Sequence, residues 1–335
     1  MATSGVQFDE DFFINERGMR LNTCRWLPVE KDVKGLVFLC HGYGMECTIY
    51  TRETGLRLAS AGYGVYGIDY EGHGKSDGLR AFVPNFDDLV TDCATFFNGV
   101  MDREEYAGKP SFLLGESLGG AVSLLVSRRD PARWSGVVLV APMLKISQKV
   151  KPAPLVISLL VQLSNFIPTW QIVPVNDIID NTFKDPLKRE EVRSNPYTYQ
   201  EKPRLKTALG MLQVSNFVEE HLAEVSLPFL CVHGLDDKVN DPEASQKLYD
   251  SAASFDKTLK LYPGMWHGLT TGEPEDNIDL VFGDITRWLN KRADTGFHSP
   301  TLRSNSVGAF ADDSKSKFRV EETEQSGGLL RLLSF

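Results

Sequence analysis

The 335-residue sequence lacks long apolar runs and has few cysteines. Its strongest apolar stretch, residues 154–163, is far shorter than the roughly 20 residues that a membrane-spanning helix requires. The five cysteines are an odd number without paired spacing, which indicates a reducing compartment. No group of cysteines and histidines has the spacing of a metal site. The sequence therefore argues against a membrane-spanning protein, a disulfide scaffold and a metal-binding module.

Basic residues are also in the minority. Lysine and arginine number 36 against 45 aspartates and glutamates, and the net charge of −9 argues against a nucleic-acid partner. Residues 1–13 lack the basic start and apolar core of a signal peptide, so we expect a cytoplasmic location. Gly-His-Gly-Lys-Ser at residues 72–76 looks like the end of a P-loop, but Asp69 stands where that motif requires glycine. We therefore expect no nucleotide and no other cofactor.

Apolar strands alternate with amphipathic helices along most of the chain. After a hairpin within residues 12–28, strands are predicted at 35–40, 64–69, 111–115, 135–140, 228–233 and 258–262, and helices at 52–61, 86–100, 119–128, 243–253 and 274–292. This repetition predicts an α/β fold with a mostly parallel sheet, right-handed crossovers and flanking helices.

A G-x-S-x-G pentapeptide lies where one of these strands ends. Residues 111–114 are an apolar strand, Gly115-Glu116-Ser117-Leu118-Gly119 follows, and residues 120–125 begin a helix. In this context the pattern predicts a nucleophile elbow, a turn so tight that only small residues fit beside the serine. Ser117 is therefore the expected nucleophile.

The two other groups of a catalytic triad follow two later strands that we expect to be buried. Asp236 and Asp237 come after strand 229–232, and His267 lies on a glycine-bearing loop after strand 258–262. The carboxyl ends of parallel strands share one edge of a sheet, so these side chains can converge with the serine. We expect His267 to be the general base. Asp237 is preferred as the acid by its spacing, His-Gly-x-x-Asp, with Asp236 as a solvated turn residue.

Two backbone N–H groups must stabilise the oxyanion that forms when a serine attacks an ester. The amide of Leu118, directly after the nucleophile, is the first expected donor. His-Gly-Tyr-Gly at residues 41–44 follows an apolar strand and indicates Tyr43 as the second. His41 and His233 each end a strand, where we expect a structural hydrogen bond to a neighbouring loop.

The segments at residues 41–44, 69–78 and 115–120, together with the acid and histidine segments, resemble the monoacylglycerol lipase family of α/β-hydrolases. More narrowly, they resemble its plant branch, which includes caffeoylshikimate esterases. The resemblance covers roughly residues 8–292. It implies cleavage of an ester between an acyl group and glycerol or another alcohol through an acyl-enzyme, with the triad and oxyanion hole named above. One departure is Leu118, where many relatives carry methionine.

The regular alternation stops after Pro142. The segment 143–226 is rich in proline, apolar in places and too long for a loop, so we expect a cap, or lid, inserted over the catalytic edge. The hydrolase core then comprises residues 1–142 and 227–292. The polar residues 293–335 are expected to form a disordered tail.

Apolar side chains at helical spacing in the cap are the best sequence evidence on the substrate. The candidates for substrate binding are Leu159, Leu160, Leu163, Phe166 and Trp170. Some of these must bury the cap on the core. A surplus of apolar surface nevertheless suits an acyl chain or a lipid interface, because each buried methylene contributes about 0.8 kcal/mol. The prediction is hydrolysis of monoacylglycerols to fatty acid and glycerol, and it is compatible with peripheral contact between the cap and a lipid surface.

Other functions remain open at this point. The cap aromatics would equally accept a phenolic acyl group, which makes caffeoylshikimate the rival substrate, and lysophospholipid hydrolysis and acyl transfer are further alternatives. A non-catalytic small-molecule receptor on a hydrolase fold is the alternative of a different class, although a complete triad favours an enzyme. Acyl length, regioselectivity and oligomeric state are not predicted.

Overall fold

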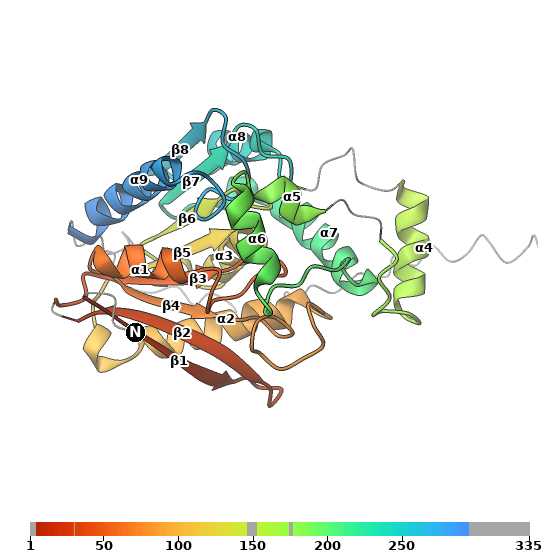
Figure 1. Ribbon diagram of the computed structural model, residues 1–335, viewed down its shortest axis with the longest axis horizontal. Coiled ribbons are helices and arrows are strands. Elements are labelled where there is room, and N and C mark those ends of the chain that lie inside the picture. The colour runs from red at the N-terminus through yellow and green to blue at the C-terminus, as the bar shows by residue number, and fades with distance from the viewer. Residues whose placement is uncertain (1–4, 30, 146–152, 174–176, 295–335) are drawn as a thin grey trace, which may run out of the picture. The chain divides into compact units, whose positions relative to one another are not determined.

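The computed structural model describes residues 5–29, 31–145, 153–173 and 177–294 (Figure 1). Its eight-stranded sheet has the order β1-β2-β4-β3-β5-β6-β7-β8. The strands are β1 (Val6–Ile14), β2 (Arg20–Pro28), β3 (Leu36–Cys40), β4 (Gly64–Ile68), β5 (Ser111–Glu116), β6 (Gly136–Val140), β7 (Phe229–Gly234) and β8 (Lys257–Tyr262). β1 pairs antiparallel with β2, and β2 with β4, whereas all other pairs are parallel. The predicted mostly parallel sheet is confirmed.

The central strands are mostly apolar because helices cover both of their faces, and Ser111, Glu116 and His233 are their polar residues. Every residue of β3 to β7 is buried, and side chains alternate between the two sides of the sheet. β8 differs from the expected buried strand. It lies at the edge of the sheet, where only Tyr262 is buried and its other residues are half-buried or exposed.

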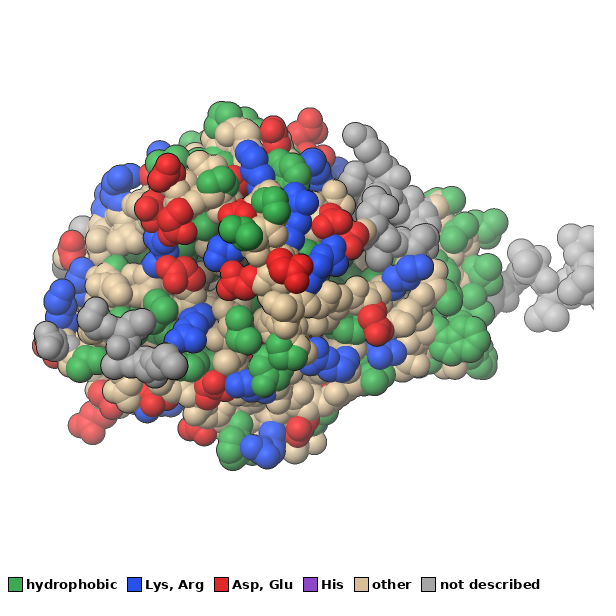
Figure 2. All heavy atoms as spheres, viewed as in Figure 1, with side chains coloured by type: hydrophobic (Ala, Val, Ile, Leu, Met, Phe, Trp, Pro, Cys, Tyr) green, Lys and Arg blue, Asp and Glu red, His purple; other side chains and the backbone are tan. Residues whose placement is uncertain are grey.

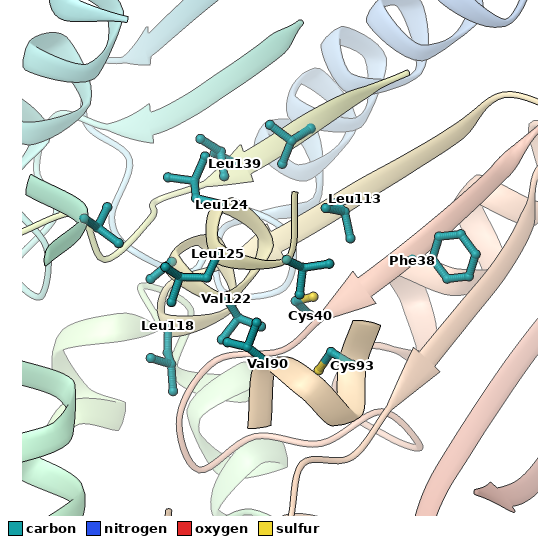
Figure 3. Close-up of a cluster of buried hydrophobic side chains, with 14 of the residues drawn as sticks. Phe38, Cys40, Val90, Cys93, Leu113, Leu118, Val122, Leu124, Leu125 and Leu139 are labelled. Carbon is teal, nitrogen blue, oxygen red and sulfur yellow. The ribbon is translucent and has the colours of Figure 1, made fainter. Parts of the chain in front are cut away.

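Helices form a layer on each face of the sheet. α2 (Phe86–Met101), α3 (Leu118–Arg129) and α8 (Pro242–Ser251) share one core cluster with the sheet, and α1 (Arg52–Ser60) and α9 (Glu275–Asp294) share the other. Figure 3 shows part of the first cluster, in which Phe38, Leu113 and Leu139 of the strands meet side chains of α2 and α3. The five cysteines are free and buried. The short 3₁₀ helices are η1 (Glu104–Tyr106), η2 (Pro131–Arg133) and η3 (Leu222–Glu224).

Among the described residues, four α-helices lie between β6 and β7, in the segment predicted to be the cap. They are α4 (Pro154–Ser164), α5 (Ile178–Thr182), α6 (Pro186–Ser194) and α7 (Leu205–Glu220). α5 and α6 pack on the core, where Ile179, Phe183 and Val192 form a cluster with Met45 and Tyr50. α4 contacts α7, and Ser164 is its only buried residue. The extent of the cap, 143–226, stays a prediction, and the predicted tail beyond Asp294 lies outside the described residues.

Candidate active site

Ser117 occupies a sharp turn between β5 and α3. Its backbone has φ 55° and ψ −117°, a conformation that a residue with a side chain adopts only when its surroundings enforce it. Both flanking glycines are required by close backbone contacts. A Cβ on Gly119 would lie 1.8 Å from the carbonyl oxygen of Cys40, and one on Gly115 would lie 2.2 Å from the carbonyl oxygen of Gly119. The local sequence thus forms the tight elbow that presents a serine at the sheet edge.

The Asp237 carboxylate is the centre of a buried hydrogen-bond cluster. Its Oδ2 atom accepts from His267 Nδ1 at 2.7 Å and from His233 Nε2 at 2.9 Å. Its Oδ1 atom accepts the backbone N–H groups of Val239 at 2.7 Å and Asn240 at 3.0 Å. The neighbouring Asp236 is exposed. Of the two aspartates, Asp237 is the one that the structure brings to His267.

The protonation of this cluster follows from its charges. Burial opposes ionisation of Asp237, but the charge of His267 and hydrogen bonds from His233 and His267 outweigh it, so the pKa of Asp237 lies below its ordinary value. An ionised carboxylate can only accept, so His267 carries a proton on Nδ1. The Nε2 atom of neutral His267 is then free to accept a proton, as a general base must.

His267 is itself tuned by two acidic groups. Burial lowers its pKa, but the charge and hydrogen bond of Asp237 and the charge of Glu116 more than compensate, and the net shift is upward. A positive charge on the His267 ring is therefore stabilised.

His233 is a member of this site that the sequence analysis did not assign to it. The sequence predicts a structural hydrogen bond from His233 to a neighbouring loop, and the group that His233 contacts is the Asp237 carboxylate. Its other ring nitrogen, Nδ1, lies 2.7 Å from Ser245 Oγ, so the hydroxyl donates to it and fixes the tautomer that donates to Asp237. The four-residue spacing between His233 and Asp237 was the one sequence feature that could have indicated this contact.

The loop at residues 41–44 lies against Ser117. A Cβ on Gly42 would lie 3.5 Å from Ser117 Cβ, so the backbone of this loop passes beside the serine. A loop that supplies an N–H group to an oxyanion hole must lie in such a place. The hydroxyl of Tyr43 donates to the Ala81 carbonyl at 2.9 Å. The Leu118 side chain is buried in the core cluster (Figure 3). The role of the Tyr43 and Leu118 backbone N–H groups in an oxyanion hole stays a prediction.

His41 supports the same loop. Its Nε2 accepts the Tyr70 N–H at 3.2 Å, and its Nδ1 lies 2.8 Å from the Gly42 carbonyl oxygen. Burial lowers the pKa of His41 to about 4, so the ring is neutral at physiological pH. This is the structural hydrogen bond to a neighbouring loop that the sequence predicted.

The chain matches the model of the serine aminopeptidase S33 family over residues 31–275. It belongs to this family. Caffeoylshikimate esterase of Arabidopsis thaliana is 34% identical over 292 residues, which are 87% of this chain and 88% of that protein. Monoglyceride lipase of Rattus norvegicus is 30% identical over 285 residues, 85% of this chain and 91% of that protein. The resemblance predicted from the motifs is confirmed, and the S33-family protein is a serine hydrolase of ester bonds.

Solved structures agree on the fold of this hydrolase. A soluble variant of monoglyceride lipase from Saccharomyces cerevisiae, in complex with a substrate analog, superposes with a TM-score of 0.74 at 24% identity. The match covers 87% of this chain and 96% of the yeast chain. The α/β-hydrolase fold expected from the sequence is thereby confirmed.

The cap residues predicted to bind substrate lie at the surface of the hydrolase. Leu159, Phe166 and Trp170 are exposed, and Leu160 and Leu163 are half-buried. Their contact with a substrate stays a prediction.

Within the described ranges, the hydrolase has no group of three or more His, Cys, Asp or Glu side chains arranged to hold a metal ion. Over the same ranges, none of its helices combines the length and the apolar character needed to cross a bilayer.

Proposed function

We propose that this serine hydrolase cleaves monoacylglycerols to free fatty acid and glycerol, with Ser117, Asp237 and His267 as its triad. The observation that carries the catalytic assignment is the buried Asp237 carboxylate, which accepts from His267 Nδ1 at 2.7 Å and leaves Nε2 as the base. The geometry and the charges of this triad suit any ester that reaches the serine.

The reaction proceeds in two proton-balanced steps. His267 Nε2 takes the Ser117 proton as Oγ attacks the ester carbonyl, and the oxyanion is held by the backbone N–H groups of Tyr43 and Leu118. The positive end of the α3 dipole, which begins at Leu118, adds to this stabilisation. The imidazolium then gives its proton to the departing glycerol oxygen. Water repeats the sequence on the acyl-enzyme and releases the fatty acid.

The exposed apolar face of the cap supports a lipid substrate. Leu155 and Phe166 are each 83% exposed, Leu159 is 60% exposed and Trp170 is 58% exposed. Figure 2 shows hydrophobic side chains gathered at the end of the molecule where Figure 1 places α4. Burial of such a surface in a lipid interface, where monoacylglycerols reside, lowers the free energy. We therefore propose peripheral contact of α4 with a lipid surface and, from the cysteine usage, a cytoplasmic location.

Caffeoylshikimate is the second candidate substrate. The Arabidopsis relative that bears this name is 34% identical, against 30% for the rat lipase. Exposed aromatic side chains of the cap, Phe166 and Trp170, offer surfaces on which a phenolic ring would stack.

The deciding experiment measures kcat/KM of the pure protein on monoacylglycerols of increasing acyl length, on a lysophospholipid and on caffeoylshikimate. The Ser117→Ala variant is the blank, and addition of an acceptor alcohol detects acyl transfer. We expect monoacylglycerols to give the highest kcat/KM, rising with acyl length. A higher kcat/KM for caffeoylshikimate than for every monoacylglycerol would overturn the proposed substrate and leave the triad untouched.

A further inference from the structure

Glu116 is a buried carboxylate at the catalytic edge that the mechanism above does not use. It is the last residue of β5, directly precedes Ser117 and is 6% exposed. Its Oε1 atom accepts a hydrogen bond from the Tyr50 hydroxyl at 2.7 Å, and its Oε2 atom accepts one from the Thr270 hydroxyl at 3.0 Å. Both hydroxyls are buried too. A carboxylate in such a place is costly unless it is hydrogen-bonded and meets a positive charge.

These two hydrogen bonds join three separate segments. Tyr50 lies on the segment after the 41–44 loop, and Thr270 lies three residues beyond His267. The backbone of Leu269 donates to the His267 carbonyl at 2.9 Å, so the histidine loop is folded tightly there. Glu116 therefore ties the nucleophile elbow to the loop that carries the base.

The charge of Glu116 acts on the same imidazole. Tyr50 and Thr270 are neutral partners, and the positive charge of protonated His267 interacts with this carboxylate. The acidic groups that act on His267 are Asp237, from the loop after β7, and Glu116, from β5. His233 contacts the other side of Asp237. Burial raises the pKa of Glu116, against the opposing effects of the Tyr50 hydrogen bond and the charge of His267.

We propose that Glu116 is a positioning residue for His267: it fixes the histidine loop through Thr270, and its negative charge stabilises the imidazolium that forms when Ser117 attacks. This inference rests on the proposed triad and is independent of which ester is cleaved. It assigns a use to the residue between Gly115 and Ser117 in the G-x-S-x-G motif, a position that the motif itself leaves free.

The charge gives the proposal a signature in the pH profile. A negative Glu116 favours protonated His267, so it moves the rising limb of kcat/KM to higher pH. Glu116→Gln retains the shape and an acceptor but removes the charge. The midpoint of its rising limb should move to lower pH, and its plateau should fall on the order of tenfold because the imidazolium loses a stabilising charge. Glu116→Asp retains the charge on a shorter side chain, so its midpoint should stay near that of the wild type while kcat falls.

Glu273→Gln is the matched control. Glu273 is also a buried carboxylate close to the histidine loop, but its oxygens accept from the Trp266 backbone N–H at 2.6 Å and the Asn277 amide at 2.8 Å. Its loss disturbs the loop without removing a charge that acts on His267, so the midpoint should not move.

The experiment measures kcat/KM for p-nitrophenyl acetate from about pH 5 to about pH 9, with a melting curve for every variant. An unmoved midpoint in folded Glu116→Gln, or an equal shift in Glu273→Gln, overturns the proposal. If the Gln variant does not fold, Thr270→Val tests the positioning arm, and an undiminished kcat overturns that arm. Undiminished turnover by Ser117→Ala would instead refute the triad. Because the acetyl ester is generic, these outcomes do not depend on the monoacylglycerol assignment.

Discussion

Replacing Asp237 with asparagine should abolish most of the catalysis while leaving the fold intact. Four N–H donors point at this carboxylate, two from the backbone of Val239 and Asn240 and two from the rings of His233 and His267. Asparagine offers one oxygen. If that oxygen stays with the backbone donors, the amide NH₂ faces both imidazoles, and His267 must turn its unprotonated nitrogen toward it.

The cost follows from that tautomer. His267 would then carry its proton on Nε2, where it cannot take the serine proton, and it would lose the anion that stabilises the imidazolium. The analogous change in a serine protease lowers kcat about 10⁴-fold, and we expect a similar loss here, equivalent to about 5.5 kcal/mol of transition-state stabilisation. Asp236→Asn is the matched control, since Asp236 is exposed and should change kcat little.

The assay is kcat for a p-nitrophenyl ester at neutral pH, with circular dichroism to verify the fold. A second readout uses the depressed pKa of Asp237. A carboxyl with a depressed pKa contributes stability above its unfolded value of about 3.9, and loses it as the pH falls through its folded value. The stability deficit of Asp237→Asn should therefore be largest near neutral pH and shrink in acid. If Asp237→Asn keeps more than about a tenth of kcat, or Asp236→Asn is the more damaging change, the acid assignment is wrong.

Three further predictions concern the nucleophile, the base and the cap. A fluorophosphonate should label Ser117, as mapped by mass spectrometry, and Ser117→Ala should lose both labelling and turnover; an adduct elsewhere would refute this. The rising limb of kcat/KM should have its midpoint above about pH 6.5, because the pKa of His267 is raised. His267→Ala should lose that limb together with the activity. A flat profile between about pH 5 and 8 would exclude His267 as the base. Replacing Leu159, Leu160 and Leu163 together with serine should lower kcat/KM for long-chain monoacylglycerols far more than for p-nitrophenyl acetate. A melting curve must show that the segment predicted to be the cap is still folded in this variant. Equal losses of kcat/KM for the two esters, or no loss, would contradict contact with the acyl chain.

Most of the core was predictable because its signals are local. Each buried parallel strand is built on a short run of apolar residues, and the Ser117 turn needs glycines at fixed neighbouring positions. The predicted helix at 119–128 was found as Leu118–Arg129, and the apolar run 154–163 as Pro154–Ser164. In such segments a few neighbouring residues determine the backbone geometry, so the local sequence is enough to predict it.

What the sequence did not predict depends on contacts between distant residues. Glu116 meets Tyr50 and Thr270 across 66 and 154 positions, and no local pattern marks a residue for such partners. β8 was expected to be a buried strand, but it contains Lys257 and Lys260 and lies at the end of the strand order, where it is half-exposed. The apolar run of α4 was equally compatible with a buried helix, because periodicity does not say whether a partner covers the face.

The segment predicted to be the cap has one part that is hydrogen-bonded to the loop beside Ser117 and one part that is not. The amide of Asn195 donates to the buried Glu46 carboxylate at 2.9 Å, and the Tyr199 N–H donates to the Gly44 carbonyl at 2.8 Å. The segment after α6 thus holds the 41–44 loop, so changes there should disturb catalysis on every ester. α4 contacts α7 and exposes its leucines, so changes there can alter which substrates arrive without moving the triad. We therefore expect substrate choice and chemistry to be separable in this chain, and the different expected responses of long and short esters to the α4 changes follow from that division.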